Sequence, residues 1–341
     1  ASSKATVHAL DGELLYTVKM PGIGTASGFN GQNDDTSVYW SFSSFNQPPS
    51  TYTLDLNSSE TSLYWRAEFP IDLSNIVVER TFVTSTDGAK VPLFIVASKD
   101  TVLDGNNPVL LYGYGGFNIS MLPHFSASRA TWINMGGVYA VGCIRGGSEY
   151  GRNWHENGML DKKQQVFDDF IACSEWLIKH KWTQNSKLGI QGGSNGGLLV
   201  GACMTQRPDL FGACLPAVGV LDMLRFQLFT VGWAWKSDYG DSDEPEMFKY
   251  LLGYSPYHNV KMGTCFPPTM VTTGDTDDRV VPAHSFKFAA ELQYAQSCEN
   301  PILIRIETRA GHGAGKPTSL RIEEAADVYA FLWKSLGMGE N

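Results

Sequence analysis

Residues 190–200 read IQGGSNGGLLV, in which Ser194 has a pair of glycines on either side. The residues before the glycines are typical of a β-strand, and those after them begin a helical pattern. Residues 192–196 follow the pattern G-x-S-x-G, which at a strand-to-helix turn is typical of a nucleophilic serine held on a tight, strained turn. A glycine-rich turn without any function is the simpler interpretation, but the strand and the helix around it favour the functional one.

The chain around this turn alternates between strand-like and helical segments from about residue 71 onward. This alternation predicts an α/β fold, in which a mainly parallel sheet is covered by helices on both faces. Ser194 then lies where one strand passes into the next helix. The predicted strands are 76–85, 91–98, 108–114, 137–143, 187–191, 212–219, 269–275 and 301–308, and the predicted helices are 161–180, 195–206, 281–297 and 319–336.

Residues 1–70 have a different texture, with short segments rich in aromatic residues, Thr and Val between clusters of turn residues. This pattern predicts antiparallel strands about ten residues apart. Two or three hairpins bury little surface by themselves. We therefore expect these strands to be part of a larger β assembly. We therefore predict two domains, residues 1–70 and residues 71–341. We expect five aromatic side chains of the first domain to face inward: Tyr39, Trp40, Phe42, Tyr64 and Trp65.

A serine nucleophile needs a general base, and the base needs an acid that orients it. In folds with this turn, the acid and then the histidine follow the serine along the chain. Among the histidines after Ser194, His258 and His284 are better explained as structural or exposed residues. His312 lies in a glycine-rich loop directly after a predicted strand, where the base is expected. The acid should follow the preceding strand, and spacing leaves three candidates open there: Asp275, Asp277 and Asp278.

The composition limits the other functions. The chain of 341 residues has a net charge of −9 and no run of Lys and Arg, which argues against a nucleic-acid partner. No apolar run reaches the ~18 residues that suggest a membrane span. No cluster of ligands indicates a metal site, and no cofactor is expected. The six scattered cysteines predict free, mostly buried thiols in a reducing compartment, so we place the protein in the cytoplasm, with a periplasmic or secreted location left open.

Seven sequence blocks, in order, resemble the prolyl oligopeptidase family. They cover the chain from about residue 20 to its end and read LLYGYGGFNIS, IRGGSEYG, GGSNGGLLV, RPDLFGACLPAVGVLDML, AWKSDYG, DDRVVPAHSFKF and AGHGAGKP. The resemblance implies an α/β-hydrolase catalytic domain capped by a seven-bladed β-propeller. It also implies hydrolysis of short peptides on the carboxyl side of proline.

The resemblance also assigns roles to individual residues. It makes Ser194 the nucleophile, His312 the base and Asp277 the orienting acid. It implies an oxyanion hole formed by the backbone N–H of Asn195 and the hydroxyl of Tyr114, a phenol replacing a second backbone donor. The implied substrate-binding residues are Phe117, Val220, Trp235, Tyr239, Arg279 and Val280, with the flat face of Trp235 stacking on proline and Arg279 holding a substrate carbonyl.

The family's chains are about twice as long, and residues 1–70 match only the end of the propeller. We therefore expect an N-terminal fragment of the same polypeptide, carrying the rest of the propeller, as a partner. The same motifs occur in peptide macrocyclases, so ring closure is an alternative to hydrolysis. An acylaminoacyl peptidase or esterase of the same fold is a further alternative. The alternative without catalysis is a propeller interaction module with a relict hydrolase.

Overall fold

A computed structural model describes residues 2–313 and 315–339, and it separates into two compact units. The first unit comprises residues 1–79, 95–101 and 122–136, and the second comprises residues 80–94, 102–121 and 137–341. The predicted domain boundary at residue 70 stays a prediction. In the part of the chain that the structure describes, no helix is both long and apolar enough to cross a membrane.

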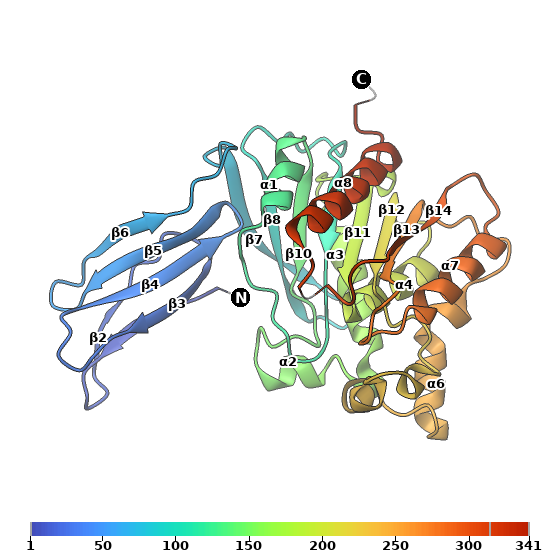
Figure 1. Cartoon of the computed structure of the whole chain (residues 1–341), viewed down its shortest axis with the longest axis horizontal. Coiled ribbons are helices and arrows are strands. Elements are labelled where there is room, and N and C mark those ends of the chain that lie inside the picture. Colours follow the sequence, from blue (N-terminus) through green and yellow to red (C-terminus); the bar gives the residue numbers. More distant parts are fainter. Residues whose placement is uncertain (1, 314, 340–341) are drawn as a thin grey trace. The chain divides into compact units, whose positions relative to one another are not determined.

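An eight-stranded sheet, built mainly from the second unit, has the strand order β14-β13-β12-β11-β9-β10-β8-β7 (Figure 1). Each neighbouring pair from β14 to β10 is parallel, which confirms the predicted α/β fold. The strands are β7 (Ile76–Thr84), β8 (Lys90–Ser98), β9 (Val109–Tyr112), β10 (Val138–Gly142), β11 (Leu188–Gly193), β12 (Ala213–Ala217), β13 (Thr269–Gly274) and β14 (Ile302–Glu307).

The inner strands, from β8 to β13, are almost continuously buried rather than alternating, because helices cover both faces of the sheet. Every residue of β10 and β13 is buried. In Figure 1, α8 crosses one face of the sheet, and α3 and α4 lie on the other. The long helices of this unit are α3 (Gln164–Lys179), α4 (Asn195–Gln206), α7 (Ala283–Ala295) and α8 (Thr318–Ser335), close to their predicted ranges; α2 (Arg152–Glu156), α5 (Lys236–Tyr239) and α6 (Pro245–Tyr254) are shorter.

The first unit is mostly antiparallel β-structure, as predicted. Strands β1 (Thr6–His8) and β2 (Leu14–Thr17) form a pair. Strands β3 (Thr25–Asn30), β4 (Ser37–Ser44), β5 (Gln47–Asp55) and β6 (Thr61–Arg66) form a four-stranded sheet in that order, and the unit also contains helix α1 (Ala127–Asn134). Its core gathers the buried residues Val18, Val38, Trp40, Phe42, Tyr52 and Leu54.

The expectation that five aromatic residues of this unit face inward is wrong for three of them. Trp40 and Phe42 are buried, but the side chains of Tyr39, Tyr64 and Trp65 are more than half exposed. Successive side chains of a strand point to opposite faces, so Tyr39 must face away from the core that Trp40 enters. Tyr39 and Tyr64 instead contact each other edge to face, with ring centroids 5.1 Å apart.

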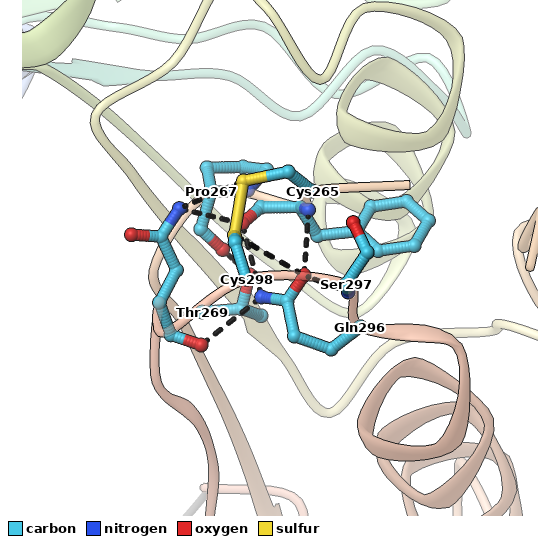
Figure 2. Close-up of a disulfide and its surroundings, with 8 residues drawn as sticks. Cys265, Pro267, Thr269, Gln296, Ser297 and Cys298 are labelled. Carbon is cyan, nitrogen blue, oxygen red and sulfur yellow. Dashed lines mark hydrogen bonds between the residues drawn. A yellow bond between two sulfur atoms is a disulfide. The ribbon is translucent and has the colours of Figure 1, made fainter. Parts of the chain in front are cut away.

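The expectation that all six cysteines are free is also wrong. Cys265 and Cys298 form a disulfide, with 5.2 Å between their Cα atoms (Figure 2). The segments that carry them run side by side, because the Gln296 side chain accepts a hydrogen bond from the backbone N–H of Phe266 and donates one to its carbonyl. The other four cysteines are free and buried, as predicted: Cys143, Cys173, Cys203 and Cys214.

Candidate active site

Ser194 lies between the end of β11 and the start of α4, as the sequence predicts. Its backbone has φ of 59° and ψ of −117°, a region that residues with a side chain rarely occupy. The strain is maintained by the surroundings, since the backbone N–H of Ser194 donates to the carbonyl of Ala217 on β12, at 2.8 Å. The serine is therefore held at the tip of a rigid turn.

Close backbone contacts explain the glycines around the serine. A Cβ atom at Gly192 would lie 2.3 Å from the carbonyl oxygen of Gly196, and one at Gly197 would lie 2.6 Å from that of Ala217. Both distances are far shorter than real contacts, so any side chain would force the turn open. At Gly193, by contrast, the nearest atom to such a Cβ would be 3.9 Å away, and no collision explains this glycine.

Asp277 and His312 contact each other directly. Nδ1 of His312 lies 2.7 Å from Oδ2 of Asp277, and a carboxylate only accepts, so the ring donates from Nδ1. A neutral imidazole that donates from Nδ1 has Nε2 as its acceptor. The other oxygen, Oδ1, accepts the backbone N–H groups of Arg279 and Val280, both at 2.9 Å. Burial alone would raise the pKa of Asp277, but the bonds from His312 and these amides outweigh it and hold this pKa below its ordinary value.

The order of the strands brings these residues to one edge of the sheet. Tyr114 follows β9, Ser194 follows β11, Asp277 follows β13, and His312 follows β14. Because these strands are parallel, their carboxyl ends meet at the same edge, where open α/β sheets bind ligands. Asp275 and Asp278, the two other candidate acids, are exposed.

The oxyanion hole assigned to Tyr114 and Asn195 stays a prediction. Burial raises the pKa of the Tyr114 phenol to about 12, and a hydrogen bond with the Ser194 side chain acts in the opposite direction. The phenol therefore stays protonated and remains a donor beside the serine. The backbone N–H of Asn195 belongs to the first turn of α4, where N–H groups have no partner within the helix.

Three of the six predicted substrate-binding residues belong to one aromatic cluster. The cluster also contains Phe226, which sequence reasoning missed. Tyr239 packs edge to face against both Phe117 and Phe226, at 5.3 Å in each case, and Trp235 stacks on Phe226 at 6.4 Å. Phe226 has no counterpart in the predicted site, and no motif in its surroundings indicates its role.

The six residues differ in exposure. Tyr239, Val220 and Val280 are buried, Phe117 and Trp235 are partly exposed, and Arg279 is exposed on the same turn as Asp277. Substrate contact by these residues stays a prediction. Among the described residues, no three His, Cys, Asp or Glu side chains come together in a way that could hold a metal ion.

Sequence reasoning also missed two buried charges near the serine, Lys163 and Asp238. Lys163 directly precedes helix α3 in a polar stretch, where a lysine normally indicates a solvated surface. Asp238 adjoins Tyr239 in the block AWKSDYG, so its position in that block was the available signal.

Family models match two parts of the chain. The model described as "Prolyl oligopeptidase family" matches residues 123–339, and the model described as "Prolyl oligopeptidase, N-terminal beta-propeller domain" matches residues 1–66. The strands of the first unit are therefore terminal strands of a β-propeller, and the sheet that carries Ser194 has the α/β-hydrolase fold, as the resemblance implies.

Individual relatives agree with these matches. The chain is 51% identical over 339 residues to a prolyl endopeptidase of Elizabethkingia miricola, covering 99% of this chain and 48% of the relative. It is 40% identical over 324 residues to a dual function macrocyclase-peptidase of Galerina marginata, covering 93% of this chain and 44% of that protein. A solved structure from a study of two prolyl endopeptidases matches with a TM-score of 0.94 and 46% identity, over 99% of this chain and 50% of the other. The chain spans about half the length of these relatives, and it belongs to the prolyl oligopeptidase family.

Proposed function

We propose that this chain carries the catalytic machinery of a serine peptidase that cleaves short peptides on the carboxyl side of proline. The observation that supports it most directly is the Asp277–His312 hydrogen bond at the sheet edge that also carries Ser194. Two relatives that are 51% and 50% identical in sequence to this chain are prolyl endopeptidases.

In the proposed reaction, His312 Nε2 accepts the Ser194 proton while Oγ attacks the carbonyl carbon of the proline residue itself. Asp277 keeps the imidazole oriented and stabilises the imidazolium. The oxyanion accepts hydrogen bonds from the Tyr114 hydroxyl and the Asn195 backbone N–H. The C–N bond then breaks, His312 returns the proton to the leaving amine, and water hydrolyses the acyl-enzyme by the same steps. Phe117 and Trp235 are partly exposed and offer an aromatic wall for a proline ring, and the buried Tyr239 packs against Phe117.

Labelling of Ser194 tests this proposal. A fluorophosphonate should label wild type and fail to label Ser194→Ala, and the variant should lose on the order of 10⁴-fold or more in kcat. Ser186→Ala is the matched control, since Ser186 is exposed just before the same strand. Activity of Ser194→Ala within tenfold of wild type would refute the mechanism, and an unlabelled, inactive wild type would favour the relict hydrolase.

Ring closure is a second candidate because a dual function macrocyclase-peptidase is 40% identical to this chain. The same acyl-enzyme would be attacked by the peptide's own amino group in place of water. The two outcomes differ in mass, since the cyclic product is lighter than the hydrolysed one by one water. Mass spectrometry of the products of a long proline-containing peptide separates them.

We also propose that another segment of the same polypeptide completes the propeller. The supporting observations are the relatives' length and the exposed Tyr64 and Trp65 on β6, a strand at the edge of its sheet. Intact-mass analysis of the purified, active protein tests this. A single active species near 37.5 kDa with nothing bound would refute it.

The disulfide bears on the compartment. We placed the protein in the cytoplasm because we expected free thiols, but a disulfide is typical of oxidising compartments. The Cys265–Cys298 bond therefore favours the alternative that we left open, a periplasmic or secreted location. Lysing the cells in denaturant with excess alkylating reagent and counting the alkylated cysteines by mass spectrometry tests this: four alkylated cysteines support it and six refute it.

A further inference from the structure

Three buried side chains hold the backbone on either side of Tyr114 in place. The Asn195 side-chain amide donates to the carbonyl of Tyr114 itself. Lys163 Nζ donates to the carbonyl of the next residue, Gly115, at 2.8 Å. The backbone N–H of Phe117 lies within 3.4 Å of both carboxylate oxygens of Asp238. The segment that carries the oxyanion donor is thus held at three closely spaced backbone groups.

The same side chains are linked to one another. Lys163 Nζ also donates to Oδ1 of Asn195, at 3.1 Å, and lies 3.8 Å from Oδ2 of Asp238. Oδ1 of Asn195 accepts a second hydrogen bond, from the Tyr239 hydroxyl at 2.9 Å. Asn195 directly follows the serine, so the network joins the turn of the nucleophile to the segment of the oxyanion donor.

The charges in this network are almost fully enclosed. Lys163 is 1% exposed and Asp238 is 2% exposed. Nε2 of His155 lies 2.7 Å from Oδ1 of Asp238. The His155 side chain is partly exposed and so connects the buried pair to the surface. Enclosing a charge of each sign costs more than an apolar pair of similar size would, so stability alone is a poor reason for their presence.

We propose that Lys163 and Asp238 are positioning residues that set the distance between the Tyr114 hydroxyl and the oxyanion that forms at Ser194. This inference rests on the proposed function. Lys163 joins Gly115 to Asn195 and so couples the two parts of the oxyanion hole. Asp238 holds Phe117 and keeps Lys163 charged.

The electrostatics agree with this arrangement. Burial lowers the pKa of Lys163 to about 8, and the Asp238 carboxylate opposes that shift. Asp238 also contributes to the raised pKa of Tyr114, although burial contributes more. Asp238 therefore helps to keep a protonated phenol, the form that donates to an oxyanion.

Lys163→Met tests the inference, because it keeps the length of the side chain and removes its donors. We expect kcat for a proline substrate to fall roughly 10- to 100-fold, as displacements of about 1 Å in an active site do. Lys162→Met is the matched control, since Lys162 is the exposed neighbour and its side chain donates to Asn157 at 3.2 Å, away from this network. Its kcat should equal that of wild type. Asp238→Asn should lower kcat and also raise KM, because the backbone N–H of Phe117 loses a charged acceptor and Lys163 loses its counter-charge. Asp243→Asn, at an exposed site, is its control.

A double-mutant comparison separates positioning from general damage. Tyr114→Phe removes the donor and should itself cost about 10²- to 10³-fold in kcat. If Lys163 acts through that donor, adding Lys163→Met to Tyr114→Phe should cost far less than it does in wild type. If Lys163 has a merely structural role, the two losses should multiply to within about twofold.

The measurements use the enzyme as purified, with any chain that accompanies it, and each kcat is divided by the fraction of sites that a fluorophosphonate labels at completion. This division removes unfolded protein from the comparison. A Lys163→Met enzyme with the kcat of Lys162→Met, or losses that multiply, would overturn the inference. A wild type that labels but does not cleave proline substrates would instead overturn the proposed function.

Discussion

Trp235 offers a sharp test of the predicted proline pocket. The side chain is partly exposed, and its ring stacks on the fully buried ring of Phe226 with an angle of 16° between the planes. Trp235→Ala removes the surface on which a proline ring is expected to stack, and it also removes the contact with Phe226. The two effects must be separated, because the second concerns the enzyme alone.

A ratio of substrates separates them. Loss of the contact with Phe226 disturbs the site for every substrate, whereas loss of stacking affects only a substrate with proline before the cleaved bond. An aromatic contact contributes about 0.5–1.5 kcal/mol beyond burial, so the preference for Pro over Ala in kcat/KM should fall about 2- to 12-fold. Trp235→Phe keeps a flat ring and should keep most of the preference.

The assay compares kcat/KM for two matched peptides that carry Pro or Ala before the cleaved bond. Trp233→Ala is the control, because Trp233 lies in the same segment and is 67% exposed, so its removal should leave the preference unchanged. Equal losses for the two peptides in Trp235→Ala would refute the stacking and leave Trp235 a structural residue.

Three further predictions concern the acid, a buried histidine and the disulfide. Asp277→Asn should lower kcat by about 10⁴-fold, because the imidazole loses the partner that sets its tautomer, while Asp278→Asn should retain activity. Burial lowers the pKa of His284 to about 4. As the pH falls, this histidine is therefore protonated in the unfolded chain before it is protonated in the folded one. The contribution of His284 to the free energy of unfolding should therefore be fully present above pH ~6.5 and fall by about 1.4 kcal/mol per pH unit down to pH ~4. Urea titrations at several pH values should give a smaller dependence on pH for His284→Gln. Replacing Cys265 and Cys298 with Ser opens a loop with a sequence separation of 33 residues, so urea unfolding should show a loss of about 3–4 kcal/mol, with kcat per labelled site unchanged.

The strands and helices of the second unit could be predicted because their patterns depend on neighbours along the chain. The turn at Ser194 is the clearest case, since the collisions at Gly192 and Gly197 are local consequences of a strand that passes directly into a helix. In the first unit, β3 has no such local signal, because TASGFN lacks an apolar alternation. The facing of Tyr39 was missed although the period of the strand determines it once Trp40 is placed inward.

The parts of the site that could not be predicted depend on distant segments. Sequence left three acids open, and only the fold shows that Asp277 contacts His312, 35 residues further along the chain. Lys163 and Asp238 are further apart still, and each alone has the pattern of a surface charge. Their burial becomes visible only when helix α3 and the segment before Tyr239 are packed beside the Tyr114 segment.

The disulfide shows how much such long-range information decides. Six cysteines give no unique pairing, and neither Cys265 nor Cys298 has a neighbouring cysteine in the sequence. Yet each lies four residues before a strand, β13 or β14, and these strands pair in parallel from Thr269 and Ile302 onward. Equal offsets before paired parallel strands place the two thiols side by side, so the register of the strands accounts for the bond. The same register brings Asp277 and His312 together beyond the carboxyl ends of these strands, whereas the disulfide lies before their amino ends. Because the Asp277–His312 contact has its own hydrogen bonds, the disulfide should stabilise the fold without tuning the chemistry.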